Sequence, residues 1–179
     1  MYRRKVSGYM VGAKVVYPSH GVGEIKEIIS QTVDKQTVEM FKIYFDSDGL
    51  TLRIPTNRVS QDGLRKITSE EDLDKALTVL KGRAKVKKSM WSRRAVEYDQ
   101  KINSGDIIQL VEVVRDLHKR DPNKDQSYSE RQLYESAYNR LAREISAVRE
   151  ITVVEAKEVI VGNLKPKRSQ KNISQEIAA

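Results

Sequence analysis

The chain has 179 residues, of which 39% are hydrophobic and 32% are charged, and it contains no cysteine. These values fit one ordinary or two small globular domains, and they exclude disulfides, thiolate metal sites and a cysteine nucleophile. The 33 Lys and Arg residues against 25 Asp and Glu residues leave a net charge of +8, which favours a polyanionic partner such as nucleic acid.

Residues 1–12 contain basic side chains but no long apolar segment or cleavage site of a secretory signal. No stretch of the chain approaches the roughly 20 apolar residues that a membrane span requires. We therefore expect a cytoplasmic protein without a membrane partner.

The first third of the chain has the composition of β-strands. Residues 11–17 and 21–30 are rich in Val, Ile and Tyr and flank a turn at 18–21. Two further strands are predicted at 40–45 and 50–55, joined by a polar turn. Four or five short strands predict a small, strongly bent sheet or barrel whose edges can pair with a partner.

Two details of these strands are informative. Gly23 predicts a bulge or a close backbone approach. Alternate positions of 50–55 are apolar and share one face: Leu50, Leu52 and Ile54. Thr51 and Arg53 fall on the opposite face, so we expect Arg53 to be solvent-accessible.

From residue 69 onward the hydrophobic period changes from two to about 3.6, which is typical of helices. Capping signals predict helices from Ser69 to about Gly82, from Ser104 toward Asp121, from Ser129 through Ile145, and from Thr152 to Gly162; Trp91–Ile102 can form another. This half is expected to be a compact helical bundle.

The change of period defines the predicted organisation, which is of the α+β class. Residues 1–66 form a β-domain and residues 67–164 form a helical domain. Residues 165–179 contain Pro166 and a Lys/Arg cluster without a core-forming pattern, so we expect a basic, disordered tail.

No constellation for catalysis is found. His20 and His118 have no Cys, Asp or Glu at a metal-ligand spacing. The glycines in residues 21–23 lack the rest of a phosphate-loop motif, and a turn accounts for them. We therefore expect that the protein is not an enzyme and binds no metal, cofactor or small-molecule substrate.

The basic surplus is concentrated in residues 81–101. This stretch contains eight Lys and Arg residues and two acidic residues, so its local net charge is +6. Cations in this position can neutralise phosphates of DNA. The candidate DNA-binding cations are Lys87, Lys88, Arg93, Arg94 and Lys101.

Trp91, the only tryptophan, lies inside this basic stretch. One interpretation is a core residue with solvated arginines beside it. The other is an exposed ring that stacks on a base or wedges at a base step while its cationic neighbours bind phosphates. The polar residues on both sides would make a poor apolar shell, which favours the second interpretation.

The sequences VGAKVVYPSHGVG at 11–23 and LTLRIP at 50–55 resemble a polymerase-interacting module that CarD/CdnL transcription regulators share with transcription-repair coupling factor. WSRR at 91–94, followed by SGD at 104–106 and VEVVRDL at 111–117, resembles the C-terminal domain of the regulators alone. The likeness runs in the same order over roughly residues 9–163, so the two halves together indicate the regulator.

The resemblance implies a Tudor-like (SH3-like) small β-barrel that binds the β subunit of bacterial RNA polymerase. It also implies a helical domain that contacts promoter DNA at the upstream edge of the transcription bubble and stabilises the open complex. In this comparison Trp91 is the minor-groove wedge, Arg93 and Arg94 are basic residues beside it, and Arg53 lies at the polymerase interface with Thr51.

The chain departs from some relatives at two positions. Gln31 stands near the place of a second basic interface residue, and Val96 stands where some relatives have a lysine. The first difference is expected to weaken or re-route polymerase contacts and the second to reduce phosphate contacts. The resemblance also implies association with the nucleoid through RNA polymerase.

Two other classes of function stay open. A polymerase-independent, non-specific or architectural DNA-binding protein would use the same basic helix and Trp91, but it would leave the β-domain without a role. A nucleic-acid-processing enzyme would require acidic or metal-binding clusters that the sequence lacks.

Overall fold

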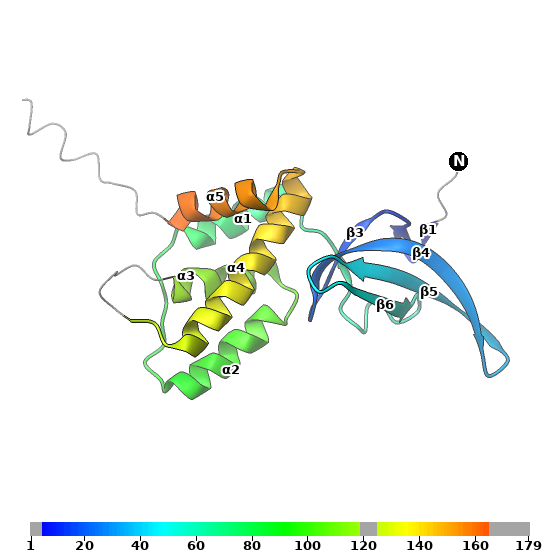
Figure 1. Ribbon diagram of the computed structural model, residues 1–179, viewed down its shortest axis with the longest axis horizontal. Helices are drawn as coiled ribbons and strands as arrows, with labels where there is room; N and C mark the ends of the chain where they lie inside the picture. The colour runs from blue at the N-terminus through cyan, green and yellow to red at the C-terminus, as the bar shows by residue number, and fades with distance from the viewer. Residues whose placement is uncertain (1–4, 119–124, 165–179) are drawn as a thin grey trace, which may run out of the picture.

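The computed structural model describes residues 5–118 and 125–164, with a sheet region followed by a helical region (Figure 1). This arrangement confirms the predicted α+β class. The tail predicted at 165–179 lies outside the described residues. The domain boundary predicted at 66/67 falls between the last strand and the first helix, and it stays a prediction.

The sheet region contains a short hairpin and a five-stranded antiparallel sheet. The hairpin consists of β1 (Lys5–Val6) and β2 (Tyr9–Met10). The sheet strands are β3 (Lys14–Tyr17), β4 (Gly21–Val33), β5 (Gln36–Phe45), β6 (Leu50–Pro55) and β7 (Arg65–Lys66). Their order is β6-β5-β4-β3-β7, so within the described residues β6 and β7 are edge strands and no pairing joins them. The sheet is bent, with β4 and β5 curving together away from the helices (Figure 1).

The inner face of the sheet packs around its own hydrophobic core. The buried members are Val15, Ile25, Phe41, Ile43, Phe45, Ile54, Val59 and Leu64. Gly23 makes the predicted close approach, because a Cβ atom there would lie 2.7 Å from Cε1 of Phe45. The register shift in β4 lies elsewhere, between Ile25 and Glu27.

Among the described residues, the second region has five helices: α1 (Glu70–Leu80), α2 (Trp91–Ile102), α3 (Ile107–Leu117), α4 (Tyr128–Arg149) and α5 (Val153–Leu164). The predicted cap of α1 is confirmed, since the Ser69 side chain accepts from the Asp72 backbone N–H. In a helix start of this kind the side chain satisfies one otherwise unpaired amide.

Two predicted helix ends are wrong. The helix expected to begin at Ser129 begins at Tyr128, because Ser127 is the cap and bonds reciprocally with Glu130. The helix expected to end at Gly162 continues to Leu164, which is buried in the helical core. Gly162 is accommodated inside the helix at a position that faces open space.

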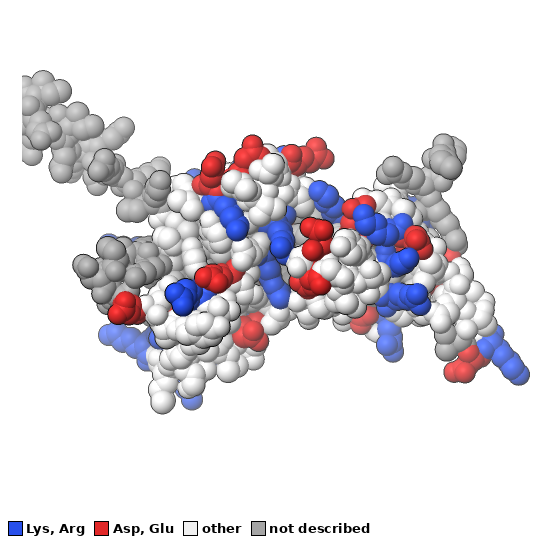
Figure 2. Space-filling model, viewed as in Figure 1, with Lys and Arg blue, Asp and Glu red and all other residues white. Residues whose placement is uncertain are grey.

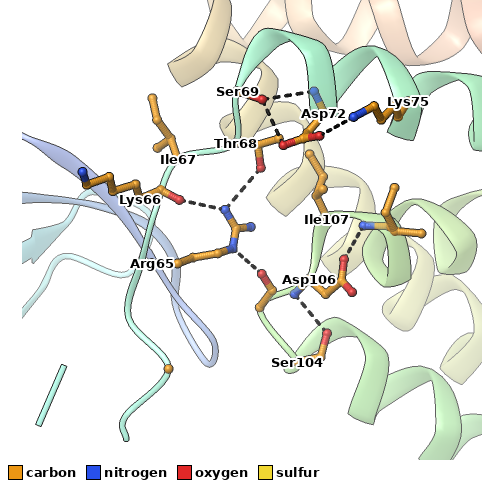
Figure 3. A pocket seen from close by; sticks show the side chains of 13 residues that line it. Arg65, Lys66, Ile67, Thr68, Ser69, Asp72, Lys75, Ser104, Asp106 and Ile107 are labelled. Carbon is orange, nitrogen blue, oxygen red and sulfur yellow. Dashed lines mark hydrogen bonds and ion pairs between the residues drawn. The ribbon is translucent and has the colours of Figure 1, made fainter. Parts of the chain in front are cut away.

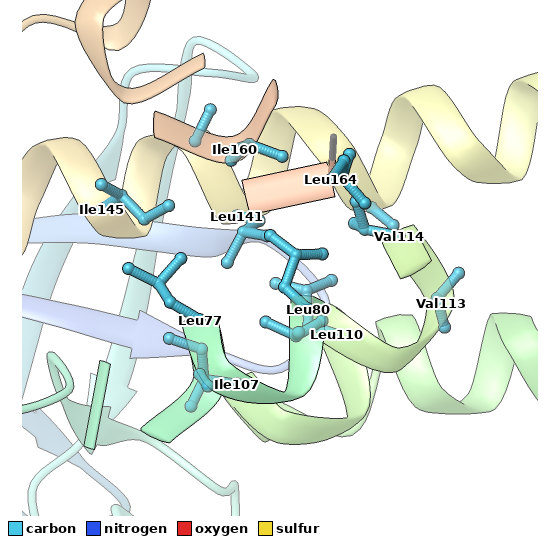
Figure 4. Packing of buried hydrophobic residues seen from close by; sticks show 14 of the residues in the cluster. Leu77, Leu80, Ile107, Leu110, Val113, Val114, Leu141, Ile145, Ile160 and Leu164 are labelled. Carbon is cyan, nitrogen blue, oxygen red and sulfur yellow. The ribbon is translucent and has the colours of Figure 1, made fainter. Parts of the chain in front are cut away.

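The helical core is larger than the core of the sheet. Side chains from α1, α3, α4 and α5 converge in it (Figure 4). The labelled members include Leu77, Leu80, Leu110, Leu141, Ile145 and Ile160. Each such side chain contributes roughly 1.5–3 kcal/mol when it is fully buried, so this cluster stabilises the bundle.

The two regions are joined by polar contacts that we call the interdomain latch, formed by Arg65, Thr68, Arg140 and Glu144 with the carbonyls they bind. Glu144 on α4 is buried, and its carboxylate accepts hydrogen bonds from Nη1 of Arg65 at 2.8 Å and from Nη2 at 3.1 Å. The Thr68 hydroxyl donates to the same carboxylate. A bidentate pair of this kind fixes orientation as well as distance.

Arg140, one helical turn before Glu144, forms the second half of the latch. Its Nη1 donates to the carbonyls of Pro18 at 2.9 Å and Ile102 at 3.0 Å, and its Nη2 donates to the carbonyl of Ser19 at 2.7 Å. Burial lowers the pKa of the Arg140 guanidinium, which the charge of Asp48 partly opposes. The turn predicted at 18–21 is therefore a contact point with the helical region.

Two glycines make room for the Pro18 ring at this contact. A Cβ atom at Gly63 would lie 2.9 Å from Cγ of Pro18, and one at Gly105 would lie 3.3 Å from it. Both glycines have positive φ angles, 73° and 77°, which other residues rarely adopt. Close packing and polar contacts together join the two regions.

Candidate protein and nucleic-acid interfaces

The first candidate interface is the outer face of the sheet, opposite its core. Thr51 and Arg53 on the edge strand β6 are exposed, while Leu50 and Leu52 are half-buried and Ile54 is buried. The predicted alternation and the accessibility of Arg53 are therefore confirmed. The Arg53 side chain has no hydrogen bond or ion pair with any other residue in 5–118 or 125–164.

The charge opposite Arg53 is already neutralised. Lys42 of β5 is the register partner of Arg53, and its Nζ lies 3.3 Å from Oε1 of Glu27 on β4. Like charges directly opposite one another in a sheet destabilise it, and the Glu27 pair relieves this for Lys42. The Arg53 guanidinium remains available for an acidic or polar partner.

Gln31 lies on the same outer face, but it is separated from Arg53. It is exposed near the far end of β4, where it pairs with Val38. Successive register partners between these positions form an apolar row across the face: Ile29, Met40 and Pro55. These three side chains are half-buried. This row was not predicted from the sequence, although the alternation of residues 40–45 places Met40 on the same face as Lys42.

The second candidate interface is the end of the helical region where α2 and α4 begin, which we call the helical tip. It comprises Met90, Trp91, Arg94, Tyr128 and Ser129. Trp91 is half-buried and packs against the helical core, with its ring centroid 6.4 Å from that of Tyr98. Its Nε1–H donates to the Ser129 hydroxyl at 2.8 Å. The tip thus joins two segments that lie 38 positions apart.

These contacts correct the environment inferred for Trp91. The polar sequence neighbours of Trp91 do not leave the ring without an apolar shell. The shell comes from Tyr98, two turns further along α2, and from the rest of the helical core. Because the ring is half-buried, it has a structural role and also retains an accessible part.

The two arginines that follow Trp91 differ in their surroundings. The Arg93 side chain is exposed and has no hydrogen bond or ion pair within the described ranges. Arg94 is half-buried, with its Cζ 5.4 Å from the centroid of the Trp91 ring and its Nη2 4.0 Å from Oε1 of Glu130. Arg94 is therefore part of the tip's own packing, and Arg93 is the more available cation.

The candidate lysines also divide into paired and available ones. Nζ of Lys87 lies 2.7 Å from Oε2 of Glu97, and Nζ of Lys101 lies 2.6 Å from Oε2 of Glu112. The Lys87 hydrogen bond holds the pKa of the Glu97 carboxyl below its usual range, and the charges of Lys101 and Arg93 act in the same direction. Lys88 is exposed and has no partner among the described residues.

On the face that Figure 2 shows, the basic surplus does not form a continuous patch. On the side shown in Figure 2, Lys and Arg side chains are interspersed with carboxylates over both regions. Lys88 and Arg93, which are exposed and have no side-chain partner among the described residues, are the cations most available to a polyanion. Exposed ion pairs contribute little stability, so Lys87 can exchange its partner for a phosphate at small cost.

A groove of about 740 Å³ lies between the two regions, around Arg65 and the starts of α1 and α3 (Figure 3). Its polar groups are used within the fold. Asp106 accepts from the Ile108 amide at 2.7 Å, and Asp72 accepts from Lys75 at 3.0 Å. Arg65 donates to the Gly105 carbonyl as well as to the carboxylate of Glu144.

The histidines have protein partners. Nδ1 of His20 lies 2.8 Å from Oδ2 of Asp48, and this hydrogen bond is the main cause that lowers the pKa of the Asp48 carboxyl. Nδ1 of His118 lies 3.1 Å from the hydroxyl oxygen of Tyr134. Within the described ranges, no group of three or more His, Cys, Asp or Glu residues has a metal-binding arrangement. No described helix has the length and apolar character to cross a membrane.

Comparison with known proteins gives two matches to protein families, in order along the chain. Residues 9–68 match the CarD-like/TRCF RID domain, and residues 75–161 match the CarD C-terminal domain. The chain is also 26% identical over 144 residues to YdeB of Bacillus subtilis (strain 168), which is named as a candidate transcription factor. That match covers 80% of this chain and 94% of YdeB.

Proposed function

Because this chain belongs to the CarD family of transcription regulators, we propose that it binds the RNA polymerase β subunit through its sheet region and promoter DNA through its helical tip. The observation that carries this proposal is the presence of two separate candidate interfaces on regions joined by the interdomain latch. The N-terminal match is to an RNA polymerase-interacting class of domain, which supports the polymerase as partner.

The polymerase interface is assigned to the outer face of the sheet. Arg53 is exposed and unpaired within the described residues, Thr51 lies beside it on the same edge strand, and Gln31 lies across the apolar row. An unpaired guanidinium next to half-buried apolar side chains is a common composition for the centre of a protein interface.

The DNA interface is assigned to the helical tip and its flanking cations. Lys88 and Arg93 are placed to contact phosphates, which supply affinity without sequence information. The accessible part of the Trp91 ring replaces lost base stacking at an opened base step, while its packing on Tyr98 and its bond to Ser129 hold the ring in position. This anchoring keeps the entropic cost of inserting the ring low.

The mechanism depends on a difference in binding free energy. Attachment to polymerase raises the effective concentration of the tip at the promoter, so weak DNA contacts become useful. If these contacts form only when the upstream duplex is opened, they lower the free energy of the open complex relative to the closed one. A difference of about 1.4 kcal/mol changes that ratio about tenfold.

The test compares the full chain with Arg53→Glu and with Lys5→Glu, a matched reversal of an exposed cation on β1, outside the five-stranded sheet. Wild type and Lys5→Glu should capture RNA polymerase from bacterial extract and lengthen the lifetime of purified open complexes. Arg53→Glu should capture about tenfold less polymerase. Failure of the wild type to bind polymerase or to lengthen the lifetime would contradict the proposed function, and equal capture by both variants would remove Arg53 from the interface.

A further inference from the structure

The most exposed large hydrophobic residues among those described flank Trp91. Met90 is 79% exposed and Tyr128 is 71% exposed, and neither belongs to the helical core. Met90 directly precedes Trp91. Tyr128 directly precedes Ser129, whose hydroxyl accepts the Trp91 hydrogen bond, so the two residues belong to the same helical tip.

The local fold does not account for either side chain. The start of α4 is capped by Ser127 and Glu130, without a contribution from Tyr128. Met90 occupies the N-cap position of α2 and makes no side-chain capping bond. Neither the Tyr128 hydroxyl nor its ring has a bonding or stacking partner in the described part of the chain. Grouped exposed apolar side chains are typical of binding surfaces.

The charge around this surface identifies the kind of partner. Lys88 and Arg93, both exposed, lie on the two sides of Met90 and Trp91 in the chain, within the stretch 81–101 of net charge +6. A partner that offers phosphates to the cations and apolar faces to the tip satisfies both properties. Nucleic acid with unstacked bases has this combination, because each base has a π-face.

We propose that Met90 and Tyr128 extend the Trp91 surface into a binding site for unstacked bases, which gives this protein a preference for forked over fully paired DNA. This inference rests on the proposed DNA-binding role of the helical tip. In a duplex the bases stack on one another, whereas an unpaired base at a fork can stack on Tyr128. The flexible Met90 side chain fits beside an opened base step.

The experiment measures binding of the full chain to a forked DNA and to a fully paired duplex of equal phosphate number, by fluorescence anisotropy at one salt concentration. Tyr128→Ala should lose about tenfold in affinity for the fork and little for the duplex. Tyr128→Phe should bind as the wild type does, because the ring is retained. Met90→Ala should show a smaller loss in the same direction.

The matched control is Val154→Ala, which removes another exposed apolar side chain, 68% exposed, from α5 at the side of the helical region away from α2 (Figure 1). The inference is overturned if Tyr128→Ala and Val154→Ala bind the fork equally well. It is also overturned if Tyr128→Ala loses fork and duplex affinity equally, or weakens only polymerase capture, which would indicate a protein partner. Thermal unfolding of Tyr128→Ala should match the wild type.

The lifetime of promoter open complexes separates this inference from the proposed function. If the wild-type chain lengthens that lifetime through Trp91 but Tyr128→Ala binds forks normally, only the further inference fails. If the wild-type chain leaves the lifetime unchanged but prefers forks through Tyr128, the proposed function fails and the base-binding site stands.

Discussion

The outer face of the sheet and the helical tip are positioned in different ways. Arg53 owes its exposure to a two-residue alternation within one strand, and nothing distant in sequence is needed to place it. Trp91 is positioned by Ser129 at the start of α4, by Tyr98 two turns further along α2, and by the helical core. We therefore expect substitutions on the sheet face to affect binding alone, and substitutions at the tip to affect binding and stability together.

The largest expected effect comes from breaking the connection between these two regions. Glu144→Ala removes a buried carboxylate and leaves Arg65 and Thr68 without their shared acceptor. The free energy of unfolding should fall by about 3 kcal/mol, because a partly buried charge loses its partner. Chemical denaturation measures this loss, with Glu135→Ala, an exposed position of the same helix, as control. Equal stability of the two variants would show that the latch contributes nothing.

Trp91→Ala should combine both kinds of effect. The half-buried ring packs on the helical core, so its truncation should lower the free energy of unfolding by about 2 kcal/mol, less than for a fully buried tryptophan. It should also shorten the open-complex lifetime about tenfold, while polymerase capture persists.

Trp91→Phe separates these two effects. It keeps an aromatic ring and loses the bond to Ser129, which is worth about 1 kcal/mol. A folded Trp91→Ala variant with an unchanged open-complex lifetime would contradict the wedge role.

Arg53→Glu should leave stability unchanged to within about 0.5 kcal/mol, in contrast to Trp91→Ala. Arg53 has no partner among the described residues, and the new carboxylate would face Lys42. Thermal unfolding checks this expectation. A clear loss of stability would mean that the sheet face, like the tip, is coupled to the rest of the fold.

The smallest effects concern individual cations at the tip. Lys88→Ala or Arg93→Ala should each reduce the slope of log affinity for DNA against log salt by about 0.9. Lys101→Ala should reduce it less, because Lys101 lies 2.6 Å from Glu112. Titrations of the full chain at several salt concentrations measure the three slopes. Equal slopes for the three variants would show that the ion pair does not withhold Lys101 from DNA.

Features governed by local rules were predictable from the sequence. The alternation in 50–55, the Ser69 cap and the close approach at Gly23 all follow from residue type and spacing within a few positions. The surroundings of Trp91 were not predictable, because they depend on a hydrogen bond to a residue 38 positions away.

Competing local signals and distant contacts explain the remaining errors. Both Ser127 and Ser129 are suitable caps for α4, and the reciprocal bonds with Glu130 select Ser127. The interdomain latch escaped prediction because no periodic pattern marks Arg65, Arg140 or Glu144 as partners.

The latch also bears on the order in which the chain folds. It joins Arg65 to Glu144 across 79 positions and Pro18 to Arg140 across 122 positions, whereas the hairpins and helices close much shorter loops. Contacts of such long range generally form late, after each region has gained its own core. Substitutions in the latch should therefore accelerate unfolding and leave the folding rate nearly unchanged.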